Sequence, residues 1–282
     1  MYVATAALCA CGGCHCSLMT VGEPFIALLA DNSISYSSHL VDRRTIAPSD
    51  VVLVTGGIRN SEELEIASEI GRTSRKVIAV GSCAVYGGIP GAGDILPVEV
   101  EDGSGLPVLL PRLEPLDTAI TVELYVPGCP PPPNLIFEAL KSVVEGYSSI
   151  RFDSTVCSDC PRRVRRGPVR RWTLHPGTGV HGADCLLSGG MLCLGPVTRG
   201  GCRASCPARG AVCAGCRGPS DAVLSSQLHS MYADMVKYVG LTCGTREDKV
   251  AREMAALLRW MYLFTRRDPV TRARIREKVV DG

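Results

Sequence analysis

Short apolar runs alternate with amphipathic segments in the first half of the chain. The three clearest runs lie at 51–55, 76–80 and 121–126, and each ends at a glycine-containing turn. Uninterrupted apolar strands of this length are typical of a parallel sheet that is covered on both faces. The alternation therefore predicts a doubly wound, flavodoxin-like α/β sheet.

Helix signals lie between the apolar runs. The sequence Asn60-Ser-Glu-Glu63 has the pattern of a capping box, which predicts a helix from there to Gly71. Residues 135–144 have helical character up to Gly146, where we expect the second helix to end.

The pattern changes after residue 150. From Cys157 onward Gly, Pro, Arg and Cys dominate, so this segment has little material for a hydrophobic core, and bound metal is expected to supply part of its folding energy. After Pro219, residues 225–239 and 246–265 are predicted helices. The second has one apolar face, expected to pack on the protein or a partner rather than on a cofactor: Val250, Met254, Leu257, Leu258, Met261 and Phe264.

Charge divides the chain at the same place. Residues 1–150 carry 8 Lys and Arg against 17 Asp and Glu, whereas residues 151–282 carry 22 against 11. We therefore predict a flavodoxin-like domain over 1–150 and a second, smaller domain over 151–282.

Six arginines lie between Arg162 and Arg171. The simplest interpretation is a solvated loop; docking to an acidic partner comes second, and nucleic acid a distant third, because no recognition motif accompanies the run. The basic tail from Arg266 to Lys278 is interpreted as a solvated end.

The chain contains 15 cysteines but neither a run of about 20 apolar residues nor the pattern of a secretory signal. Cysteine-rich chains of this kind more often bind metal than form disulfides. We therefore expect a reducing, cytoplasmic location and no membrane span.

Four cysteines of the first half follow predicted strands. Cys11 and Cys14 follow the first apolar run, and Cys83 and Cys129 each follow a later one. Open parallel sheets bind ligands beyond the carboxyl ends of their strands, so these loops are expected to bring four thiolates together. The alternative for Cys83 and Cys129 is that each is only a buried apolar side chain.

Eight further cysteines fall into two sets of four. Soft thiolates select iron–sulfur clusters or zinc, and Cys-x-x-Cys spacing serves both. The irregular spacing, and the proline that follows Cys160 and Cys206, favour clusters over zinc. The first set is Cys157, Cys160, Cys185 and Cys193, and the second is Cys202, Cys206, Cys213 and Cys216.

Taken together, the motifs resemble those of the small, electron-transferring subunit of nickel–iron hydrogenases over nearly the whole chain up to Pro219. They are Cys11-Gly-Gly-Cys14, Gly81-Ser-Cys-Ala-Val-Tyr-Gly-Gly-Ile-Pro-Gly91, Pro127-Gly-Cys-Pro-Pro131 and Cys193-Leu-Gly-Pro-Val-Thr198. The resemblance implies a flavodoxin-like domain with a proximal 4Fe–4S cluster on Cys11, Cys14, Cys83 and Cys129. It also implies a large partner subunit that holds the nickel–iron site.

The same resemblance assigns the other two sets. Cys157, Cys160, Cys185 and Cys193 match the distal cluster, with Cys157 where many relatives have histidine. Cys202, Cys206, Cys213 and Cys216 match the medial cluster, and the fourth cysteine implies 4Fe–4S where many relatives have proline and 3Fe–4S. This chain would then hold three 4Fe–4S clusters and no catalytic residue. Cys9, Cys16 and Cys243 remain spare, as small buried side chains or surface thiols.

Within this family the chain looks most like the gamma subunit of the methyl-viologen-reducing, deazaflavin-non-reducing hydrogenases of methanogenic archaea. That likeness implies electron transfer from dihydrogen, split on the large subunit, through an iron–sulfur adaptor to heterodisulfide reductase. One departure is Thr55, where relatives often have an acidic residue before Gly56-Gly57.

Several alternatives stay open at this point. The small subunits of sulfhydrogenases and of deazaflavin-reducing hydrogenases are near ones. The quinone-linked subunit of respiratory complex I has similar strand-end cysteines, but it has adjacent paired cysteines and lacks an eight-cysteine second domain. A zinc-dependent nucleic-acid-binding protein is the alternative from a different class.

Overall fold

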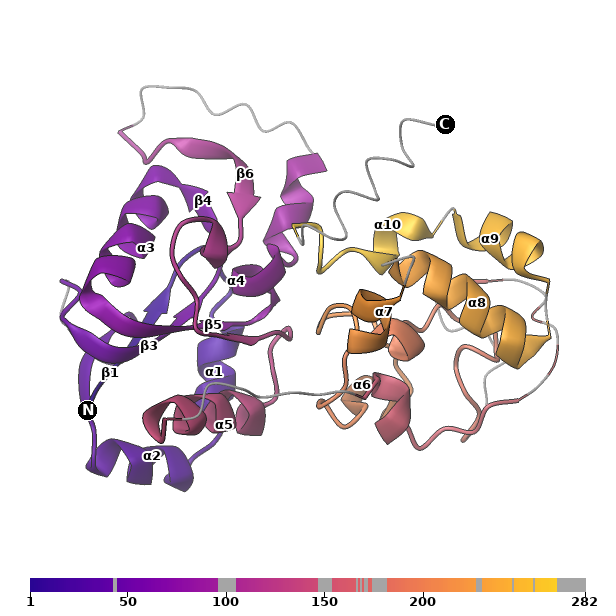
Figure 1. Cartoon of the computed structure of the whole chain (residues 1–282), viewed down its shortest axis with the longest axis horizontal. Coiled ribbons are helices and arrows are strands. Elements are labelled where there is room, and N and C mark those ends of the chain that lie inside the picture. Colours follow the sequence, from indigo (N-terminus) through magenta and orange to yellow (C-terminus); the bar gives the residue numbers. More distant parts are fainter. Residues whose placement is uncertain are drawn as a thin grey trace. The chain divides into compact units, whose positions relative to one another are not determined.

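A computed structural model describes residues 1–42, 45–95, 105–146, 154–165, 167, 169, 172–173, 182–226, 230–244, 246–255 and 257–267. The chain divides into two compact units (Figure 1). The first comprises Met1–Ile150 together with a short segment that begins at Phe264, and the second begins at Arg151.

The first unit is built on a five-stranded parallel sheet, which confirms the predicted α/β class. The strand order is β2-β1-β3-β5-β7. Strands β4 and β6 belong to a separate sheet, so the five strands, counted along the chain, have the flavodoxin-like order 2-1-3-4-5. The central strand β3 is buried along nearly its whole length, as its apolar run predicts. The strands are β1 Tyr2–Ala7, β2 Ser33–Ser37, β3 Ser49–Thr55, β5 Ser74–Val80 and β7 Leu124–Val126.

Helices cover this sheet and lead away from its strand ends. They are α1 Gly13–Met19, α2 Glu23–Ala30, α3 Ser61–Thr73, α4 Ser82–Tyr86 and α5 Pro133–Val144. The predicted capping box is present at α3, where Glu63 N–H donates to Asn60 Oδ1 at 2.8 Å and Asn60 N–H donates to Glu63 Oε2 at 3.2 Å. The buried face of α5, with Leu135, Ile136 and Leu140, packs against β3, β5 and β7.

Two details of this unit differ from the predictions. The third apolar run forms a strand only over Leu124–Val126, because β5 pairs with it only from Ile78 to Val80. A small antiparallel pair, β4 Ile58–Asn60 with β6 Leu109–Glu114, was not predicted. Short 3₁₀ turns at Pro90–Ile95 and Leu116–Thr118 complete the regular structure described in this unit.

The second unit has only short elements up to residue 226, and its two longer helices, α8 and α9, come after it. The elements are 3₁₀ turns η3 Val156–Asp159 and η4 Gly195–Val197, and helices α6 Ser205–Ala208, α7 Asp221–Ser225, α8 Met231–Cys243, α9 Glu247–Ala255 and α10 Leu258–Met261. The helix predicted over 225–239 is displaced to α8, which Gly244 caps in the left-handed conformation (φ 63°). The helix predicted over 246–265 is divided into α9 and α10.

This unit has more hydrophobic core than its cysteine-rich segment alone predicts. Met235 and Val239 of α8 and Val250 and Met254 of α9 are buried in one cluster with apolar residues of the segment 186–197. The predicted apolar face of the last helices therefore packs on the protein. The side chain of Leu258 lies outside the described residues.

No single described helix is long and apolar enough to cross a membrane. Helices α1 and α2 together meet the length and composition of a span, but they are bent by 83° at the break between them.

Candidate metal centres

The cysteines of the first unit stand where its strands end. Cys11 lies between β1 and α1, and Cys14 lies in the first turn of α1. Cys83 lies in the first turn of α4 after β5, and Cys129 follows β7. The electrostatic environment of Cys14 includes the thiols of Cys83, Cys129 and Cys11, and that of Cys83 includes Cys129 and Cys11. The structure therefore brings together the four cysteines that the sequence predicts as one ligand set.

Glycines let the backbone approach these thiols. Gly81 has a φ of +90°, and a Cβ there would overlap Cys14 Sγ. Gly88 has a φ of +53°, and a Cβ there would lie 2.8 Å from Cys83 Sγ. Both positions require glycine for their backbone conformation and for the space of the neighbouring cysteine.

Hydrogen bonds fix the Cys129 loop to the other cysteine-bearing elements. Ser17 Oγ in α1 donates to Pro131 O at 2.6 Å. Ser82 N–H at the start of α4 donates to Gly128 O at 2.8 Å, and Gly128 N–H donates to Ser82 Oγ at 3.2 Å. These hydrogen bonds join the loop of Cys129 to helix α1, which holds Cys14, and to helix α4, which holds Cys83.

Burial controls the chemistry of these thiols. Burial first, and then repulsion from the neighbouring thiols, raise the pKa of Cys14 and that of Cys83 to about 12. The groups are therefore protonated at neutral pH unless a cation joins them. Metal binding would displace these protons, and this donor set fits an iron–sulfur cluster, whose cationic iron offsets the repulsion.

The second candidate centre is a cavity in the second unit. Its volume is about 130 Å³, roughly ten times the space that one water needs. The four cysteines of the predicted distal set line it: Cys157, Cys160, Cys185 and Cys193. Burial, then repulsion from the other three thiols, raises the pKa of Cys157 to about 12. Size and donor set both fit a polynuclear cluster.

Within the predicted medial set, the described contacts join Cys213 to Cys216. Cys213 is buried, and its electrostatic environment includes Cys216 and the distal-set thiol of Cys193, whose Sγ accepts from Cys213 N–H at 3.3 Å. Cys206 lies exposed in α6, and Cys202 lies just before that helix. Their grouping with Cys213 and Cys216 stays a prediction.

Among the described residues, no three His, Cys, Asp or Glu side chains are close enough to hold a single metal ion. Within the second unit, the thiols of the predicted distal set instead line one cavity of about 130 Å³.

Two of the three spare cysteines lie beside predicted ligands, which the sequence did not indicate. Cys9 is in the electrostatic environment of Cys83, and burial raises the pKa of Cys9 itself. Cys243, the last residue of α8, is buried and lies in the environment of Cys185. Cys16 is exposed on α1, as a surface thiol would be.

Tyr238 is a further residue that sequence reasoning missed. It lies on α8 and lines the cavity of the predicted distal set. Burial and the thiols of Cys157, Cys185, Cys243 and Cys193 raise the pKa of its phenol to about 12, so the hydroxyl keeps its proton. Helix α8 thus borders a candidate cofactor site.

His15 explains the unusual Thr55. The imidazole is buried beside Cys14, and its Nδ1 lies 3.2 Å from Thr55 Oγ1. Burial, then the His39 ring at 4.4 Å between centroids, lowers the pKa of His15 to about 4. A neutral hydroxyl is a suitable partner for this neutral ring.

The prediction that the two basic segments are solvated is partly wrong. Arg162 is half-buried and donates to three backbone carbonyls: Pro207 O, Gly182 O at 3.0 Å and Asp184 O at 2.9 Å. Arg163 and Arg165 are exposed as expected, and Arg166, Arg170 and Arg171 lie outside the described residues.

In the predicted basic tail, Arg267 is buried, with its N–H donating to Tyr86 O at 3.0 Å. The tail beyond residue 267 lies outside the described residues.

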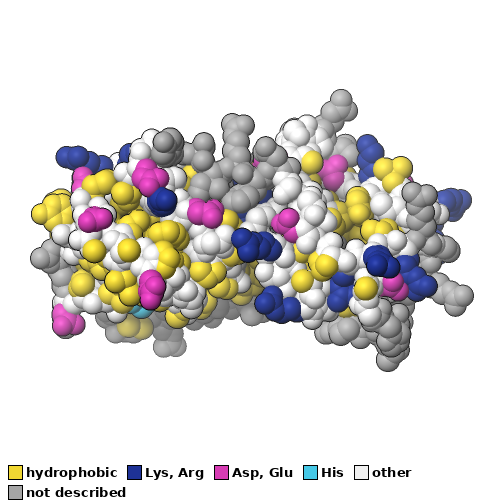
Figure 2. Space-filling model, turned by 90° about the horizontal axis from the view of Figure 1, so that it is seen from below, with side chains coloured by type: hydrophobic (Ala, Val, Ile, Leu, Met, Phe, Trp, Pro, Cys, Tyr) yellow, Lys and Arg dark blue, Asp and Glu magenta, His cyan; other side chains and the backbone are white. Residues whose placement is uncertain are grey.

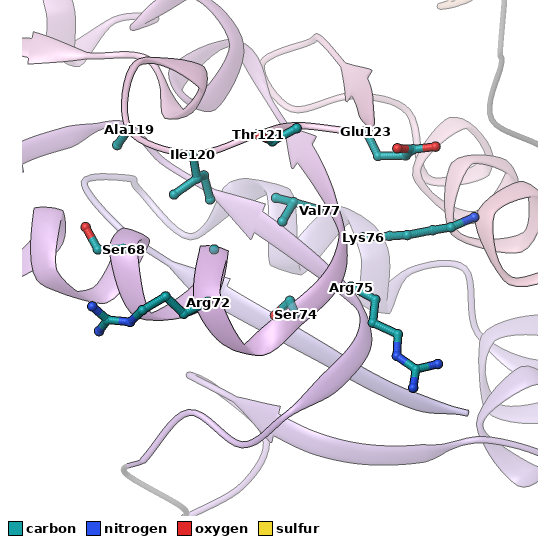
Figure 3. Close-up of a pocket in the computed structure, with 11 residues that line it drawn as sticks. Ser68, Arg72, Ser74, Arg75, Lys76, Val77, Ala119, Ile120, Thr121 and Glu123 are labelled. Atoms are coloured by element: carbon teal, nitrogen blue, oxygen red, sulfur yellow. The ribbon is translucent and has the colours of Figure 1, made fainter.

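A cavity of about 400 Å³ lies at the start of β5, the end opposite to the cysteines. Arg72, Arg75 and Lys76 line it, but Figure 3 shows their side chains pointing in different directions. These cations therefore do not converge on one ligand.

Known proteins resemble both parts of the chain. Residues 11–143 match the family model of the NADH ubiquinone oxidoreductase 20 Kd subunit, and this match ends before Cys157. Structural likeness extends further: a chain of the [NiFeSe] hydrogenase from Desulfovibrio vulgaris Hildenborough shares the fold with a TM-score of 0.52. That likeness has 20% identity and covers 77% of this chain and 93% of that chain.

Sequence relatives cover both units. A subunit of the vhu F420-non-reducing hydrogenase of Methanococcus voltae is 35% identical over 246 residues, 80% of this chain and 85% of the relative. The protein of the same name from Methanocaldococcus jannaschii is 34% identical over 262 residues, 86% of this chain and 90% of the relative. A relative from Archaeoglobus profundus, 29% identical over 255 residues, covers 74% of this chain and 79% of its own length, and is named as the iron–sulfur subunit of such an enzyme. The chain therefore belongs to the family of F420-non-reducing hydrogenase iron–sulfur subunits.

Proposed function

We propose that this chain carries electrons from dihydrogen oxidation, at a nickel–iron site on a partner large subunit, to a downstream acceptor. Convergence of four thiols in each unit of a hydrogenase subunit is the observation that supports this proposal most. The chain would bind three 4Fe–4S clusters: proximal on Cys11, Cys14, Cys83 and Cys129, medial on Cys202, Cys206, Cys213 and Cys216, and distal on Cys157, Cys160, Cys185 and Cys193.

Bound at these sites, iron–sulfur clusters would supply one-electron chemistry at a potential that their surroundings set. The chain's own part is to give up the protons of thiols such as Cys14 and Cys157 and to hold the thiolates in place. Val156, Leu186 and Leu187 are buried apolar side chains that line the distal cavity. Because its pKa is lowered, His15 is neutral at pH 7 and adds no positive charge beside Cys14.

We further propose that the acceptor is a heterodisulfide reductase complex, reached through a small iron–sulfur adaptor subunit. The support is the sequence resemblance to methanogen hydrogenases and the names of the relatives, which exclude F420 as their acceptor. Isolation of the native complex under anaerobic conditions, followed by identification of its subunits, tests this assignment. Absence of a large hydrogenase subunit from the complex would contradict the proposal as a whole.

Metal analysis tests the cluster count. We expect about twelve iron and twelve sulfide per chain, because each 4Fe–4S cluster uses four thiolates. Cys157→Ala should remove about four iron atoms, whereas Cys16→Ala, at an exposed thiol outside the sets, should remove none. Stoichiometric zinc with little iron would overturn the assignment.

A further inference from the structure

The chain returns to the first unit near its C-terminal end. After the second unit, the residues from Phe264 onward belong to the first unit again. Thr265 is 1% exposed and Arg267 is 8% exposed, so both are buried there. Figure 2 shows several Lys and Arg side chains at the protein surface, and Arg267 differs from them because it is buried. We call residues 264–267 the C-terminal strap.

The strap packs on the end of α4, the helix that holds Cys83. Arg267 N–H donates to Tyr86 O at 3.0 Å, which gives a partner to one carbonyl at the end of this helix. The side-chain stem of Arg267 lies against the next residue, because a Cβ added at Gly87 would lie 2.6 Å from Arg267 Cγ and 3.2 Å from Arg267 Cβ. Glycine at position 87 therefore leaves the space that the arginine stem occupies.

The following glycine contacts the thiol of the predicted proximal ligand. A Cβ added at Gly88 would lie 2.8 Å from Cys83 Sγ and 2.8 Å from Cys83 N. Gly87 N–H donates to Cys83 O at 3.0 Å, and Gly91 N–H donates to Gly87 O at 3.0 Å, so the loop 87–91 is a compact turn. This glycine-rich loop thus meets the thiol at Gly88 and the strap at Gly87.

We propose that Arg267 is a positioning residue of the proximal site, and that its side-chain stem holds the loop 87–91 against Cys83. The inference rests on the proposed function, because the loop supports a cluster only when Cys83 is a ligand. The stem of an arginine contributes packing that is separate from its charge. Its removal would leave space beside Gly87, so the loop would open more often and hold Cys83 less firmly.

The position of the strap in the sequence has a consequence for assembly. The four predicted proximal ligands lie within the first 129 residues, whereas the strap follows the second unit. The proximal site would therefore be complete only when the end of the chain is in place. A basic segment that the sequence predicts to be solvated would in this way begin with a structural part of the first unit.

The test is the rate at which a chelator removes iron from the anaerobically purified complex, followed by electron paramagnetic resonance. The proximal signal is the one that Cys14→Ala lacks, and the distal signal, which Cys157→Ala lacks, is the internal control. Arg267→Ala removes Cγ and should lose the proximal signal about tenfold faster than the wild type, with the distal rate unchanged. The g values of its proximal signal should also shift, because the loop beside the cluster moves.

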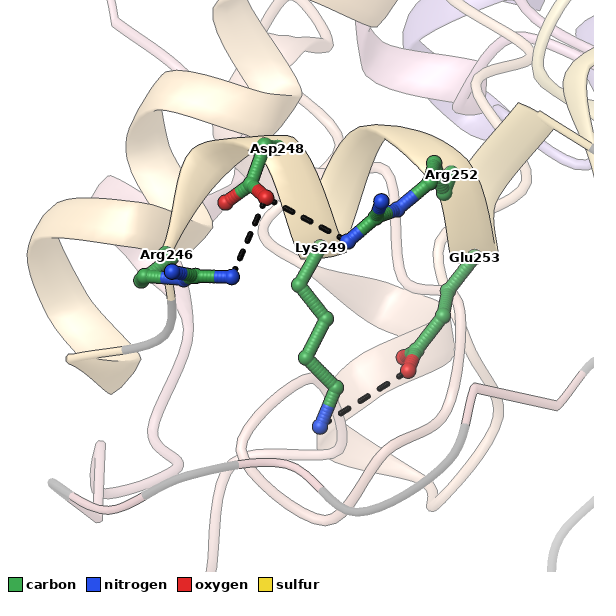
Figure 4. A network of polar contacts seen from close by, with 5 residues as sticks. All are labelled: Arg246, Asp248, Lys249, Arg252 and Glu253. Carbon is green, nitrogen blue, oxygen red and sulfur yellow. Dashed lines mark hydrogen bonds and ion pairs between the residues drawn. The ribbon is translucent and has the colours of Figure 1, made fainter.

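Two point variants separate the stem from the charge. Arg267→Gln keeps Cβ and Cγ without the charge, and it should restore the wild-type rate and g values. Arg246→Ala removes an exposed arginine that pairs with Asp248 at 3.3 Å (Figure 4), and it should also match the wild type. Equal acceleration in Arg267→Gln and Arg267→Ala would show that the charge matters rather than the stem, and would overturn the packing role.

Two chain lengths separate the strap from the residues after it. A chain that ends after residue 263 lacks the strap and should lose the proximal signal at least as fast as Arg267→Ala. A chain that ends after residue 268 keeps the strap and should match the wild type. Equal acceleration in the two shortened chains would assign the effect to later residues and overturn the strap.

The full-length variants decide alone if the shorter chain does not fold. A wild-type rate in Arg267→Ala, or equal acceleration in Arg246→Ala, would overturn the positioning role of Arg267. The proposed function fails separately: it is contradicted if Cys14→Ala has as much iron as the wild type, a comparison that involves no change in the strap.

Discussion

The first unit presents the thiols of Cys14, Cys83 and Cys129 at the ends of strands whose core is complete, with β3 buried along nearly its whole length. In the second unit, Cys157, Cys185 and Cys193 lie in turns and loops, and the nearest long helix, α8, is distant in sequence. The sheet would hold its cysteine loops without metal, because parallel pairing and helix packing already fix them. The loops of the second unit have fewer such restraints, so metal must contribute more to their order.

The largest expected effect is therefore metal removal. We predict that chelation under reducing conditions strips both units of iron but loosens only the second. Amide hydrogen exchange should rise strongly over residues 154–226, whereas β1, β3 and β5 keep their protection. Mass-spectrometric exchange on loaded and stripped protein measures both regions at once. Equal loss of protection in the two units would show that the sheet also depends on its cluster.

Gly81 tests how tightly the first unit is built around its thiols. We predict that Gly81→Ala costs about 3 kcal/mol or more, because the Cβ overlaps Cys14 Sγ and the backbone is restricted to glycine. The matched control is Gly22→Ala, where φ is +73° but no atom lies within 4 Å of the added Cβ. Its cost should be the backbone strain alone, about 1–3 kcal/mol.

Iron content separates the two glycine variants more clearly than stability does. Gly81→Ala should lose about four iron atoms because Cys14 is displaced, whereas Gly22→Ala should keep all of them. Chemical denaturation and iron analysis provide the two measurements. Full iron in Gly81→Ala would mean that the backbone around Cys14 shifts to make room for the added methyl group and is therefore not rigid.

Local sequence patterns account for much of the first unit and less of the second. The apolar runs of β3 and β5 and the capping box at Asn60 are local signals, and the structure confirms them. The contacts of Arg162 with Pro207 O and of Tyr238 with the distal cavity join residues far apart in sequence. No local periodicity encodes such contacts. The sequence therefore favours a solvated loop for Arg162 and gives no role to Tyr238.

In the metal-free protein, the stability of both units should fall at alkaline pH, whereas chelation should loosen only the second unit. Burial raises the pKa of Cys14, Cys83 and Cys157 from 9.0 to about 12. A folded state that favours the protonated thiol is fully stabilised below about pH 9 and loses that stability as pH rises toward 12. Three pKa units at about 1.4 kcal/mol each put the loss at up to about 4 kcal/mol for each buried thiol over the whole window.

Thermal melts of stripped and loaded protein across this alkaline range provide the measurement. In the loaded protein the thiols are already deprotonated by iron, so its melting temperature should change less between pH 8.5 and 10.5, roughly the lower half of the titration window. Identical slopes for the two forms would contradict the assignment of these cysteines as ligands.

The smallest expected effect concerns the tuning of the distal site by α8. Tyr238 lines the cavity, and its protonated hydroxyl lies among the distal thiols. A hydroxyl that donates to the cluster or its thiolates stabilises the reduced form, so Tyr238→Phe should lower the reduction potential. One hydrogen bond contributes about 0.5–1.5 kcal/mol, which corresponds to some tens of millivolts for one electron.

The control comes from the same helix. Tyr232 donates its hydroxyl to Ala251 O at 2.7 Å and does not line the cavity, so Tyr232→Phe removes a hydroxyl of similar setting without touching the site. Redox titration followed by electron paramagnetic resonance compares the two variants with the wild type at equal iron content. A lower potential in Tyr238→Phe alone supports a hydrogen bond from α8 to the distal site. An unchanged potential would limit Tyr238 to closing the cavity, and the second unit would then tune its site through the loops and Arg162 rather than through its helices.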